Sequence, residues 1–225
     1  MSSLEKVVIF GTGSIGEVVY WYLTKNGHYE VVGFAADREY VNRKELFRLP
    51  TIPFEEVEKV YPPTEYKMLI AVSYRDMNKI RAQKFWEAKK KGYQFITYVD
   101  ARAIVWDNVK IGENCFIFEA NVIQPFVKIG NDVIIWSGNH IGHHTTIGDH
   151  CFIASHAVVC GHVTIDPYCF IGVNSTIREG VRVAKGSLIG AGALIVKDTE
   201  EGGVYGGHPA TLLRKLSNDE LRDLT

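Results

Sequence analysis

The chain has 225 residues, of which 46% are hydrophobic and 23% are charged, and its formal net charge is −1. These values are typical of a globular protein with room for one large domain or two small ones. The near-neutral charge gives no support for binding nucleic acids or anionic membranes, and no apolar run approaches the roughly 18 residues of a transmembrane helix. The N-terminus lacks the pattern of a signal peptide, so we expect a cytoplasmic protein.

The first hundred residues alternate between segments typical of strands and of helices. A glycine-rich turn, Gly11–Gly16, separates the first strand from an amphipathic helix that stops at Asn26-Gly27. The predicted strands are Lys6–Phe10, Glu30–Ala36, Met68–Ser73 and Phe95–Val99, and the predicted helices are Glu17–Lys25 and about Met77–Lys91. A strand, a glycine turn, a helix and a second strand form half of a dinucleotide fold, so residues 1–100 are expected to form a Rossmann-like α/β domain.

The glycine turn has the spacing GxGxxG, which lets backbone amides approach a pyrophosphate at a helix N-terminus. Asp37, at the end of the second strand, is placed to bind a ribose hydroxyl. The same pattern is also compatible with a simple tight turn. Because only about 100 residues are available, with no second half for a nicotinamide, a diphosphate nucleotide such as a nucleotide-sugar is favoured over a dinucleotide. The predicted substrate-binding residues are Gly11, Gly13, Ser14, Gly16 and Asp37.

From Ala103 to Asp198 the sequence repeats every six residues without interruption, in sixteen hexads. The third place is always Ile or Val, and the first place is mostly small. A hexad that is one short strand and one bend closes a triangular coil every 18 residues, which predicts a parallel β-helix over residues 101–199. The third and first places should face inward. Glycine occupies the fourth place in six hexads, where we expect a corner with unusual φ and ψ; these residues are Gly112, Gly130, Gly142, Gly148, Gly172 and Gly190.

Histidines and cysteines are unevenly placed in the repeat. Three of the four cysteines hold first places and are interpreted as packing residues; they are Cys115, Cys151 and Cys169. Six of the eight histidines fall within two coils, a clustering for which a scaffold alone gives no reason; they are His140, His143, His144, His150, His156 and His162.

The spacing of these histidines argues against a metal site. Histidines six residues apart lie on different sides of the prism, and only His144 and His162, 18 residues apart, stack on one another. Two ligands alone make a poor site, so no metal is predicted. His150 and His156 are expected to be exposed corner residues. In the tail, residues 200–225, Thr211–Leu224 is predicted to form a short helix with Ser217 or Asn218 as a break or cap, covering the open strand edge of the solenoid.

The order of these elements, with a closing Gly-Gly-His-Pro-Ala at 206–210, resembles a known family. This family is the bacterial nucleotide-linked amino-sugar N-acetyltransferases of hexapeptide-repeat type, which includes the bacillosamine-pathway enzymes and has the sialic-acid O-acetyltransferases as relatives. The resemblance implies a left-handed β-helix, a homotrimer, acetyl-CoA bound between adjacent solenoids, a nucleotide-sugar held by the N-terminal domain, and a role in surface-glycan synthesis.

The resemblance also implies roles for individual residues. The family's catalytic histidine stands two residues after a hexad Ile, which makes His143 the general base here, with His144 beside it. The residues implied for the acetyl-CoA wall are Gly161, Val173, Asn174 and Ala191, and the Gly161 N–H is a candidate oxyanion donor. The chain departs from the family at three places: His144 replaces the usual acid, Phe152 replaces a second histidine, and Ser73-Tyr74-Arg75 replaces a Gly-Asn-Asn-like loop.

The sequence thus predicts an acetyl-CoA-dependent N-acetyltransferase in which a sugar amine attacks the thioester directly. A sugar O-acetyltransferase is the first alternative, although an alcohol needs its base more and the acid after His143 is missing. A non-catalytic nucleotide-sugar binding protein is the second alternative, and a dehydrogenase is the third.

Overall fold

The computed structural model describes residues 4–25 and 27–217 and divides into two compact units. One, the N-terminal unit, contains the residues up to Ser73 and Gln83–Ile96. The other, the solenoid unit, contains Tyr74–Ala82 and the residues from Thr97 onward. Asn26, half of the predicted helix stop, and residues 218–225 of the predicted C-terminal helix lie outside the described residues.

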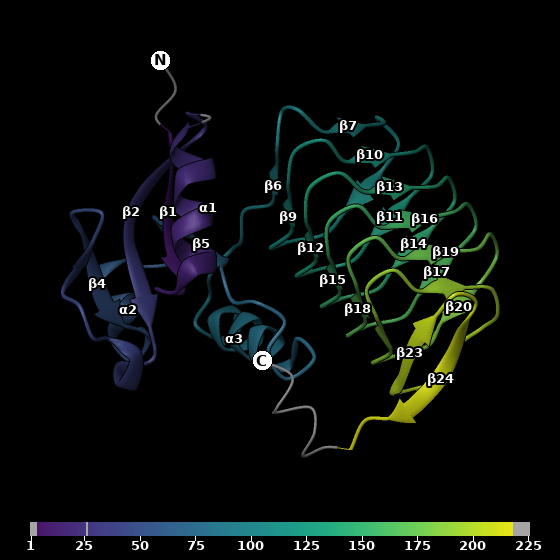
Figure 1. The fold of residues 1–225 in the computed structure, drawn as a ribbon. Coiled ribbons are helices and arrows are strands. Elements are labelled where there is room, and N and C mark those ends of the chain that lie inside the picture. The colour runs from purple at the N-terminus through teal and green to yellow at the C-terminus, as the bar shows by residue number, and fades with distance from the viewer. Residues whose placement is uncertain (1–3, 26, 218–225) are drawn as a thin grey trace. The chain divides into compact units, whose positions relative to one another are not determined.

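The N-terminal unit is a twisted, mostly parallel sheet with helices, as the sequence predicts (Figure 1). Its strand order is β3-β4-β2-β1-β5, and β3 alone is antiparallel, to β4. The strands are β1 (Glu5–Phe10), β2 (Tyr29–Ala36), β3 (Glu45–Leu46), β4 (Leu49–Pro53) and β5 (Lys67–Ile70). The helices are α1 (Ser14–Lys25), α2 (Val57–Val60) and the part of α3 (Lys79–Lys90) that begins at Gln83, with 3-10 turns η1 (Arg38–Tyr40) and η2 (Phe54–Glu56). The chain moves from β1 to β2 on one side and to β5 on the other, so the carboxyl end of β1 is a topological switch point, where ligands of open α/β sheets bind.

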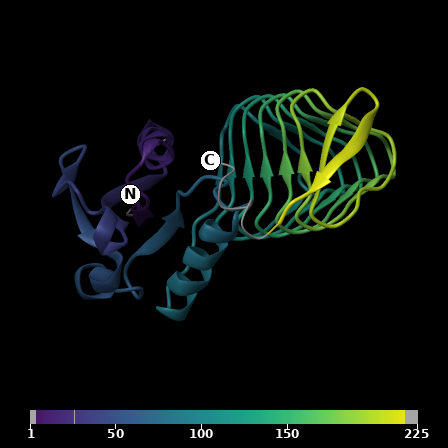
Figure 2. The same ribbon diagram turned by 60° about the horizontal axis from the view of Figure 1, so that its bottom comes forward.

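The coils of the solenoid unit consist of two-residue strands that pair in parallel to form three sheets (Figures 1 and 2). The first sheet contains β7 (Ile104–Val105), β10 (Val122–Ile123), β13 (His140–Ile141), β16 (Val158–Val159), β19 (Thr176–Ile177) and β22 (Leu194–Ile195). The second contains β8 (Lys110–Ile111), β11 (Lys128–Ile129), β14 (Thr146–Ile147), β17 (Thr164–Ile165) and β20 (Arg182–Val183). The third contains β6 (Tyr98–Val99), β9 (Phe116–Ile117), β12 (Ile134–Ile135), β15 (Phe152–Ile153), β18 (Phe170–Ile171) and β21 (Leu188–Ile189), followed by β23 (Gly203–Gly207) and β24 (Ala210–Lys215).

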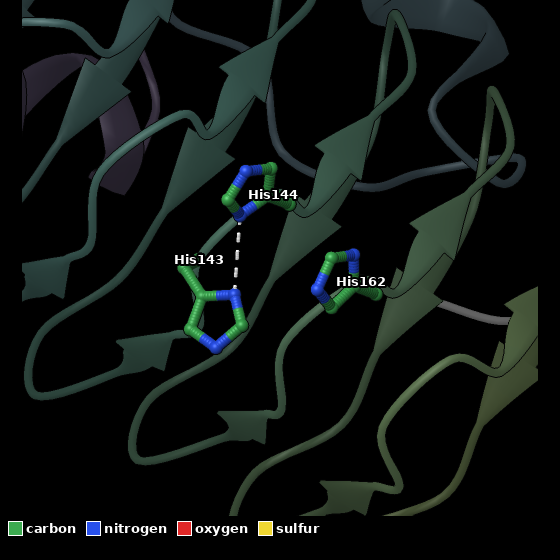
Figure 3. A group of neighbouring side chains, drawn as sticks. All are labelled: His143, His144 and His162. Carbon is green, nitrogen blue, oxygen red and sulfur yellow. Dashed lines mark hydrogen bonds between the residues drawn. The ribbon is translucent and has the colours of Figure 1, made fainter.

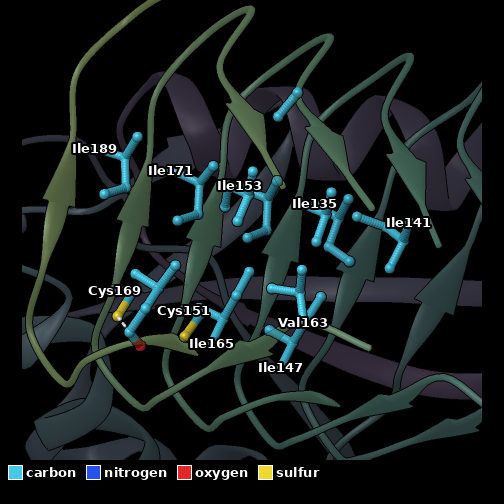
Figure 4. Packing of buried hydrophobic residues seen from close by; sticks show 14 of the residues in the cluster. Ile135, Ile141, Ile147, Cys151, Ile153, Val163, Ile165, Cys169, Ile171 and Ile189 are labelled. Carbon is cyan, nitrogen blue, oxygen red and sulfur yellow. Dashed lines mark hydrogen bonds between the residues drawn. The ribbon is translucent and has the colours of Figure 1, made fainter. Parts of the chain in front are cut away.

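The inward faces of the coils match the hexad prediction (Figure 4). Third-place residues pair with their copies 18 positions later, as Ile135 does with Ile153 and Ile153 with Ile171. Cys115, Cys151 and Cys169, at first places, are fully buried. Each fully buried Ile or Val stabilises the fold by about 1.5–3 kcal/mol relative to exposure. The prediction of a left-handed parallel β-helix whose first and third places face inward is therefore confirmed.

The solenoid begins one hexad earlier than the sequence suggested. The strand predicted over Phe95–Val99 is divided: Phe95 makes an isolated bridge to Met68 of β5, whereas β6 pairs with β9 in the third sheet of the solenoid. Thr97 already has a coil position, because its Oγ1 accepts a hydrogen bond from the N–H of Cys115, 18 residues later. The sequence Thr97–Arg102 keeps the hexad phase with Val99 in third place, although its other positions are unlike the later repeats.

The six fourth-place glycines are needed for a different reason from the predicted one. None of them has a positive φ; the neighbouring coil simply passes too close for a side chain. A β-carbon at Gly148 would lie 2.7 Å from the backbone nitrogen of Pro167, and one at Gly172 would lie 2.5 Å from the carbonyl oxygen of Ile189. The left-handed conformation occurs instead at the sixth place of the hexad, where ten residues other than glycine adopt it; these are Asn114, Ala120, Phe126, Asp132, His144, His150, His156, His162, Tyr168 and Asn174.

This conformation explains part of the histidine cluster. Histidine, like Asn and Asp, is enriched several-fold among non-glycine residues with positive φ. Four of the six clustered histidines hold sixth places with φ between 57° and 61°, so the scaffold does give them a reason. His140 and His143 have no such explanation.

His150 is not the exposed corner residue that the sequence suggested. It is buried, and its Nδ1 lies 2.7 Å from Oδ2 of Asp132, one coil earlier. The same carboxylate lies 3.1 Å from Nε of the fully buried Arg81, at the start of α3. This buried polar network attaches residues 74–82 to the outside of the third sheet. Removing one partner from such a buried ion pair typically costs about 3–5 kcal/mol. His156, by contrast, is exposed as expected.

The described part of the tail is a strand, not the start of a helix. β24 contains the first five residues of the segment Thr211–Leu224, which was predicted to be helical. It pairs antiparallel with β23, which extends the third sheet from β21. The expected purpose, covering the open strand edge, is therefore met by a hairpin. No helix in the described residues combines the length and apolarity needed to cross a bilayer.

We expect Gly148→Ala to destabilise the protein by about 1–3 kcal/mol, because the added methyl group would overlap the backbone of the next coil. Gly190→Ala is the matched control: its methyl group would lie 3.1 Å from the carbonyl oxygen of Tyr205, in the terminal hairpin, which needs a smaller shift. Urea unfolding of both variants measures the difference. Equal loss of stability in the two variants would contradict close approach as the reason for these glycines.

Candidate active site

Five residues gather at the corner of the solenoid where the first sheet turns into the second; we call it the histidine corner. His143 and His144 lie between β13 and β14, Gly161 and His162 lie between β16 and β17, and Phe126 lies one coil earlier. The 18-residue period therefore places His143 over Gly161 and stacks Phe126, His144 and His162 in one column. The three histidines are exposed.

The His143 ring lies against Gly161. A β-carbon at Gly161 would lie 2.7 Å from Cε1 of His143 and 3.0 Å from its Nε2, so any other residue would push the ring away. The backbone around His143 is held from both sides. Its N–H donates to Oε1 of Gln124 at 2.9 Å, and its carbonyl oxygen accepts from the N–H of His162 at 2.9 Å. Sequence reasoning missed the Gln124 contact, because glutamine at that place is outside the hexad pattern.

The two adjacent histidines contact each other through their side chains (Figure 3). Nδ1 of His143 lies 3.2 Å from Nδ1 of His144, so one of these nitrogens donates a hydrogen bond and the other accepts it. His144 thus contacts the ring at the atom where an orienting acid would act. The resemblance implies an acid at this position, and here an imidazole occupies it.

His144 is itself held between two rings. It stacks on Phe126 with ring centroids 4.6 Å apart and on His162 with centroids 4.8 Å apart and planes 14° from parallel. The ring of His143 is 5.0 Å from that of His162 and nearly perpendicular to it. The predicted stacking of His144 and His162 is present. His143 contacts both rings as a third neighbour, and the argument from six-residue spacing missed this contact.

The remaining residues expected to contact acetyl-CoA lie elsewhere on the prism. Val173, Asn174 and Ala191 occupy the corner between the third and first sheets, at the opposite end of the first sheet from the histidine corner. All three are exposed, and Val173 and Ala191 stack in adjacent coils, where the N–H of Gly192 donates to the carbonyl oxygen of Val173. One chain therefore does not bring the predicted acetyl-CoA residues together.

Two departures from the family pattern contact one another. The ring of Tyr74 lies 5.0 Å from that of Phe152 and 4.8 Å from that of Phe170. Phe152 is buried, on the outer face of the third sheet. The two substitutions thus form one aromatic cluster rather than two separate changes.

In the N-terminal unit the glycine turn follows β1 and leads into α1. Gly11 has a φ of 124° and its β-carbon would lie 2.4 Å from the carbonyl oxygen of Ala71, while a β-carbon at Gly16 would lie 2.1 Å from the carbonyl oxygen of Gly11. These two glycines are therefore required by packing of the strand and helix. Gly13 has open space around its α-carbon, and Ser14 is the first residue of α1. The turn can accept an anion at the helix N-terminus.

Asp37 already has a partner. Nζ of Lys84 lies 2.7 Å from Oδ1 of Asp37 and 2.8 Å from Oε2 of Glu87. Burial opposes the charge of Lys84, but the hydrogen bonds that it donates to the two carboxylates outweigh this effect and raise the pKa of Lys84. This lysine lies beside the predicted nucleotide end of the sheet, and sequence reasoning missed it because it comes from α3, far along the chain.

Comparison with protein families matches three segments of the chain. Residues 6–87 match the PglD N-terminal domain, residues 121–161 match the bacterial transferase hexapeptide family, and residues 162–197 match the hexapeptide repeat of succinyl-transferase. No curated protein sequence matches the chain.

Several solved structures share the fold over nearly their whole length. A variant of perosamine N-acetyltransferase from Caulobacter crescentus, in complex with CoA and GDP-perosamine, is 20% identical, with a TM-score of 0.85 and coverage of 95% of this chain and 99% of that one. The acetyltransferase domain of PglB from Neisseria gonorrhoeae is 25% identical, with a TM-score of 0.84 and coverage of 93% and 100%. WeeI from Acinetobacter baumannii is 20% identical, with a TM-score of 0.81 and coverage of 93% and 100%.

The fold and the family matches together indicate an acyltransferase. A segment similar to the PglD N-terminal domain is followed by repeats similar to those of bacterial hexapeptide transferases, as in the family that the sequence resembles. That resemblance is confirmed.

We expect only Cys160 to react with a thiol reagent in the folded protein. Burial raises the pKa of Cys115 to about 12 and that of Cys169 well above its usual value, and Cys151 is also buried, whereas Cys160 is partly exposed. Since the thiolate is the reactive form, Cys115 and Cys169 stay protonated, and burial shields all three of these thiols from the reagent. Titration with a chromogenic disulfide should give one thiol per native chain and four after unfolding. Rapid labelling of two or more native thiols would contradict this assignment.

Proposed function

We propose that the protein transfers an acetyl group from acetyl-CoA to the amine of a nucleotide-linked amino-deoxy sugar, with His143 as the general base. The contact that carries this proposal is the one between His143 and Gly161 on a hexapeptide solenoid. Packing against Gly161 gives the exposed imidazole of His143 a defined orientation on a fixed backbone. The structural neighbour from Caulobacter crescentus, bound to CoA and GDP-perosamine, supports the substrate class.

The tautomer of His143 follows from its contact with His144. If His143 is to accept a proton at Nε2, its Nδ1 must carry hydrogen and donate to Nδ1 of His144, 3.2 Å away. His144 is then the acceptor that replaces the family's acid. It lacks the negative charge of a carboxylate, so it orients the ring with less stabilisation of the imidazolium. An amine nucleophile, which needs less help than an alcohol, suits this weaker arrangement.

The reaction proceeds by direct attack. The neutral amine nitrogen attacks the thioester carbonyl carbon and gives its proton to Nε2 of His143. The tetrahedral intermediate collapses as the C–S bond breaks, and the protonated imidazole returns the proton to the CoA sulfur, so the products are an amide and free CoA. Among the described residues, no acceptor takes the N–H of Gly161, which makes it available to the oxyanion. No acyl-enzyme is required, so Cys160 has no catalytic part.

The N-terminal unit is proposed to hold the nucleotide. The glycine turn before α1 offers backbone amides to a diphosphate, and Gly13 leaves room beside it. Asp37 and Lys84 form a charged pair at the end of β2 that can bind ribose or base through Asp37. The match of residues 6–87 to the PglD N-terminal domain supports this assignment.

A homotrimer is proposed because the predicted acetyl-CoA residues occupy two corners of one prism. Val173, Asn174 and Ala191 would serve the histidine corner of a neighbouring copy, so the site would be complete only between subunits. The first sheet, which joins these corners, also exposes Ile104 and Val158, side chains that a neighbouring copy would cover.

The function is tested by CoA release from acetyl-CoA with a panel of nucleotide-linked 3- and 4-amino sugars. We expect turnover with one of them and a fall in kcat of roughly 10²–10⁴ in His143→Asn, since the proton-transfer contribution is lost while binding is kept. CoA should be measured by chromatography, because Cys160 would consume a thiol reagent.

The matched control is His156→Asn, which changes an exposed histidine at another corner and should keep wild-type activity. His144→Glu restores the family's acid and should retain or increase turnover, whereas His144→Asn should lower it. Activity that survives His143→Asn would remove His143 as the base. Turnover only with hydroxyl acceptors would replace the N-acetyltransferase by an O-acetyltransferase.

The trimer is tested by sedimentation equilibrium, where we expect three times the chain mass of 25.3 kDa. Mixing two inactive variants, His143→Asn and a variant with Ala191→Trp, should restore activity if the two corners come from different chains. A monomer with full activity would contradict the shared site.

A further inference from the structure

The three imidazoles of the histidine corner form a group that the proposed acetyl transfer does not fully use. One ring nitrogen from each of His143, His144 and His162 lies within 4.8 Å of the others. Two of the ligands come from one turn and the third comes from the turn one coil later, so the solenoid backbone fixes their spacing. Figure 3 shows the three rings gathered around a common point.

The chemistry of this group is that of a transition-metal site. Zinc takes imidazole nitrogens at about 2.0–2.1 Å in tetrahedral geometry, which places two ligand nitrogens about 3.3–3.4 Å apart. The Nδ1 atoms of His143 and His144 are already 3.2 Å apart. The ring of His162 now stacks on that of His144, so it has to rotate about its outer torsion to direct a nitrogen at the same point; this torsion is broad for histidine, and the side chain is exposed.

The surroundings favour the same class of ion. Positive φ fixes the backbone of His144 and His162, and Phe126 stacks on the ring of His144. Zinc would replace the present stacking of His144 on His162, because two parallel rings cannot both direct a lone pair at one ion. The ligand set is three neutral nitrogens, which suits zinc, nickel or cobalt; magnesium and calcium prefer oxygen ligands. The fourth position stays open to water.

We propose that the histidine corner binds one Zn²⁺ per chain through His143, His144 and His162, and that this binding inhibits the enzyme. The inhibitory part rests on the proposed function of His143 as the base. When Nδ1 of His143 binds zinc, it can no longer donate a hydrogen bond to Nδ1 of His144, and the proton of the neutral ring lies on Nε2. His143 then has no free lone pair for the proton of the amine. Metal and proton thus compete for one imidazole.

Metal binding is measured without reference to activity. The untagged protein, freed of metal with a chelator, is titrated with Zn²⁺ in the presence of a chromogenic chelator, and separately with Co²⁺. We expect one Zn²⁺ per chain and the intense visible bands of tetrahedral cobalt. His162→Asn keeps the corner conformation, because asparagine tolerates positive φ. It should weaken zinc binding at least about tenfold, since a loss of that size follows even when only a hydrogen-bond partner of a metal ligand is removed. His156→Asn, the matched control, should bind like wild type.

Three results would overturn the proposal: no zinc binding at micromolar concentration, an octahedral cobalt spectrum, or equal weakening in His162→Asn and His156→Asn. The inhibitory part is tested by the zinc concentration that halves the rate of CoA release, measured for each protein relative to its own metal-free rate. This concentration should be higher for His162→Asn than for wild type. Zinc binding without inhibition would overturn that part alone. Absence of turnover in metal-free wild type with every acceptor would count against the proposed function and leave the binding result standing.

Discussion

The structure depends on one constraint, the 18-residue register that places every residue of a coil over its counterpart in the next. The inward Ile and Val ladder, the glycines at close approaches and the left-handed corners all follow from this register. The histidine corner follows from it as well. His143 fits because residue 161, one coil later, has no side chain, and His144 and His162 stack because they are 18 residues apart. A chemical site of two coils is thus built by the same spacing that builds the core.

The buried polar column at the next corner has a different purpose. Asn114, Asp132 and His150 are stacked in successive coils, and Arg81 reaches the same carboxylate from the start of α3. These groups are nearly inaccessible to solvent, so they serve attachment rather than chemistry. Similar residues at sixth places thus have different roles at the two corners. Where another segment covers the corner, they form a buried structural network; where the corner is exposed, their side chains are accessible to ligands.

Much of the fold was predictable because the hexad period is long and uninterrupted. The strands β1 and β2, the helix α1 and the inward residues of the coils agree with the sequence. The start of the solenoid at Thr97 was missed because its first hexad has atypical residues outside the third place. The burial of His150 could not be predicted, since it depends on Arg81, which is distant in sequence. The hairpin in place of a helix after Ala210 is set by pairing with β21, through β23, and this tertiary pairing overrides local propensity. At the site, spacing placed His144 under His162 but did not indicate that the ring of His143 turns toward both.

The left-handed corners have a consequence for how such a protein changes over generations. A sixth-place residue must tolerate positive φ, and the residues that do so best apart from glycine are Asn, Asp and His. The codons of these three amino acids differ from one another by a single base. A corner can therefore exchange an amide, a carboxylate and an imidazole in single mutational steps while the backbone stays as it is. The column Asn114, Asp132, His150 displays all three at one corner of the same prism. New bases or ligands can in this way arise at any exposed corner without first weakening the scaffold that holds them.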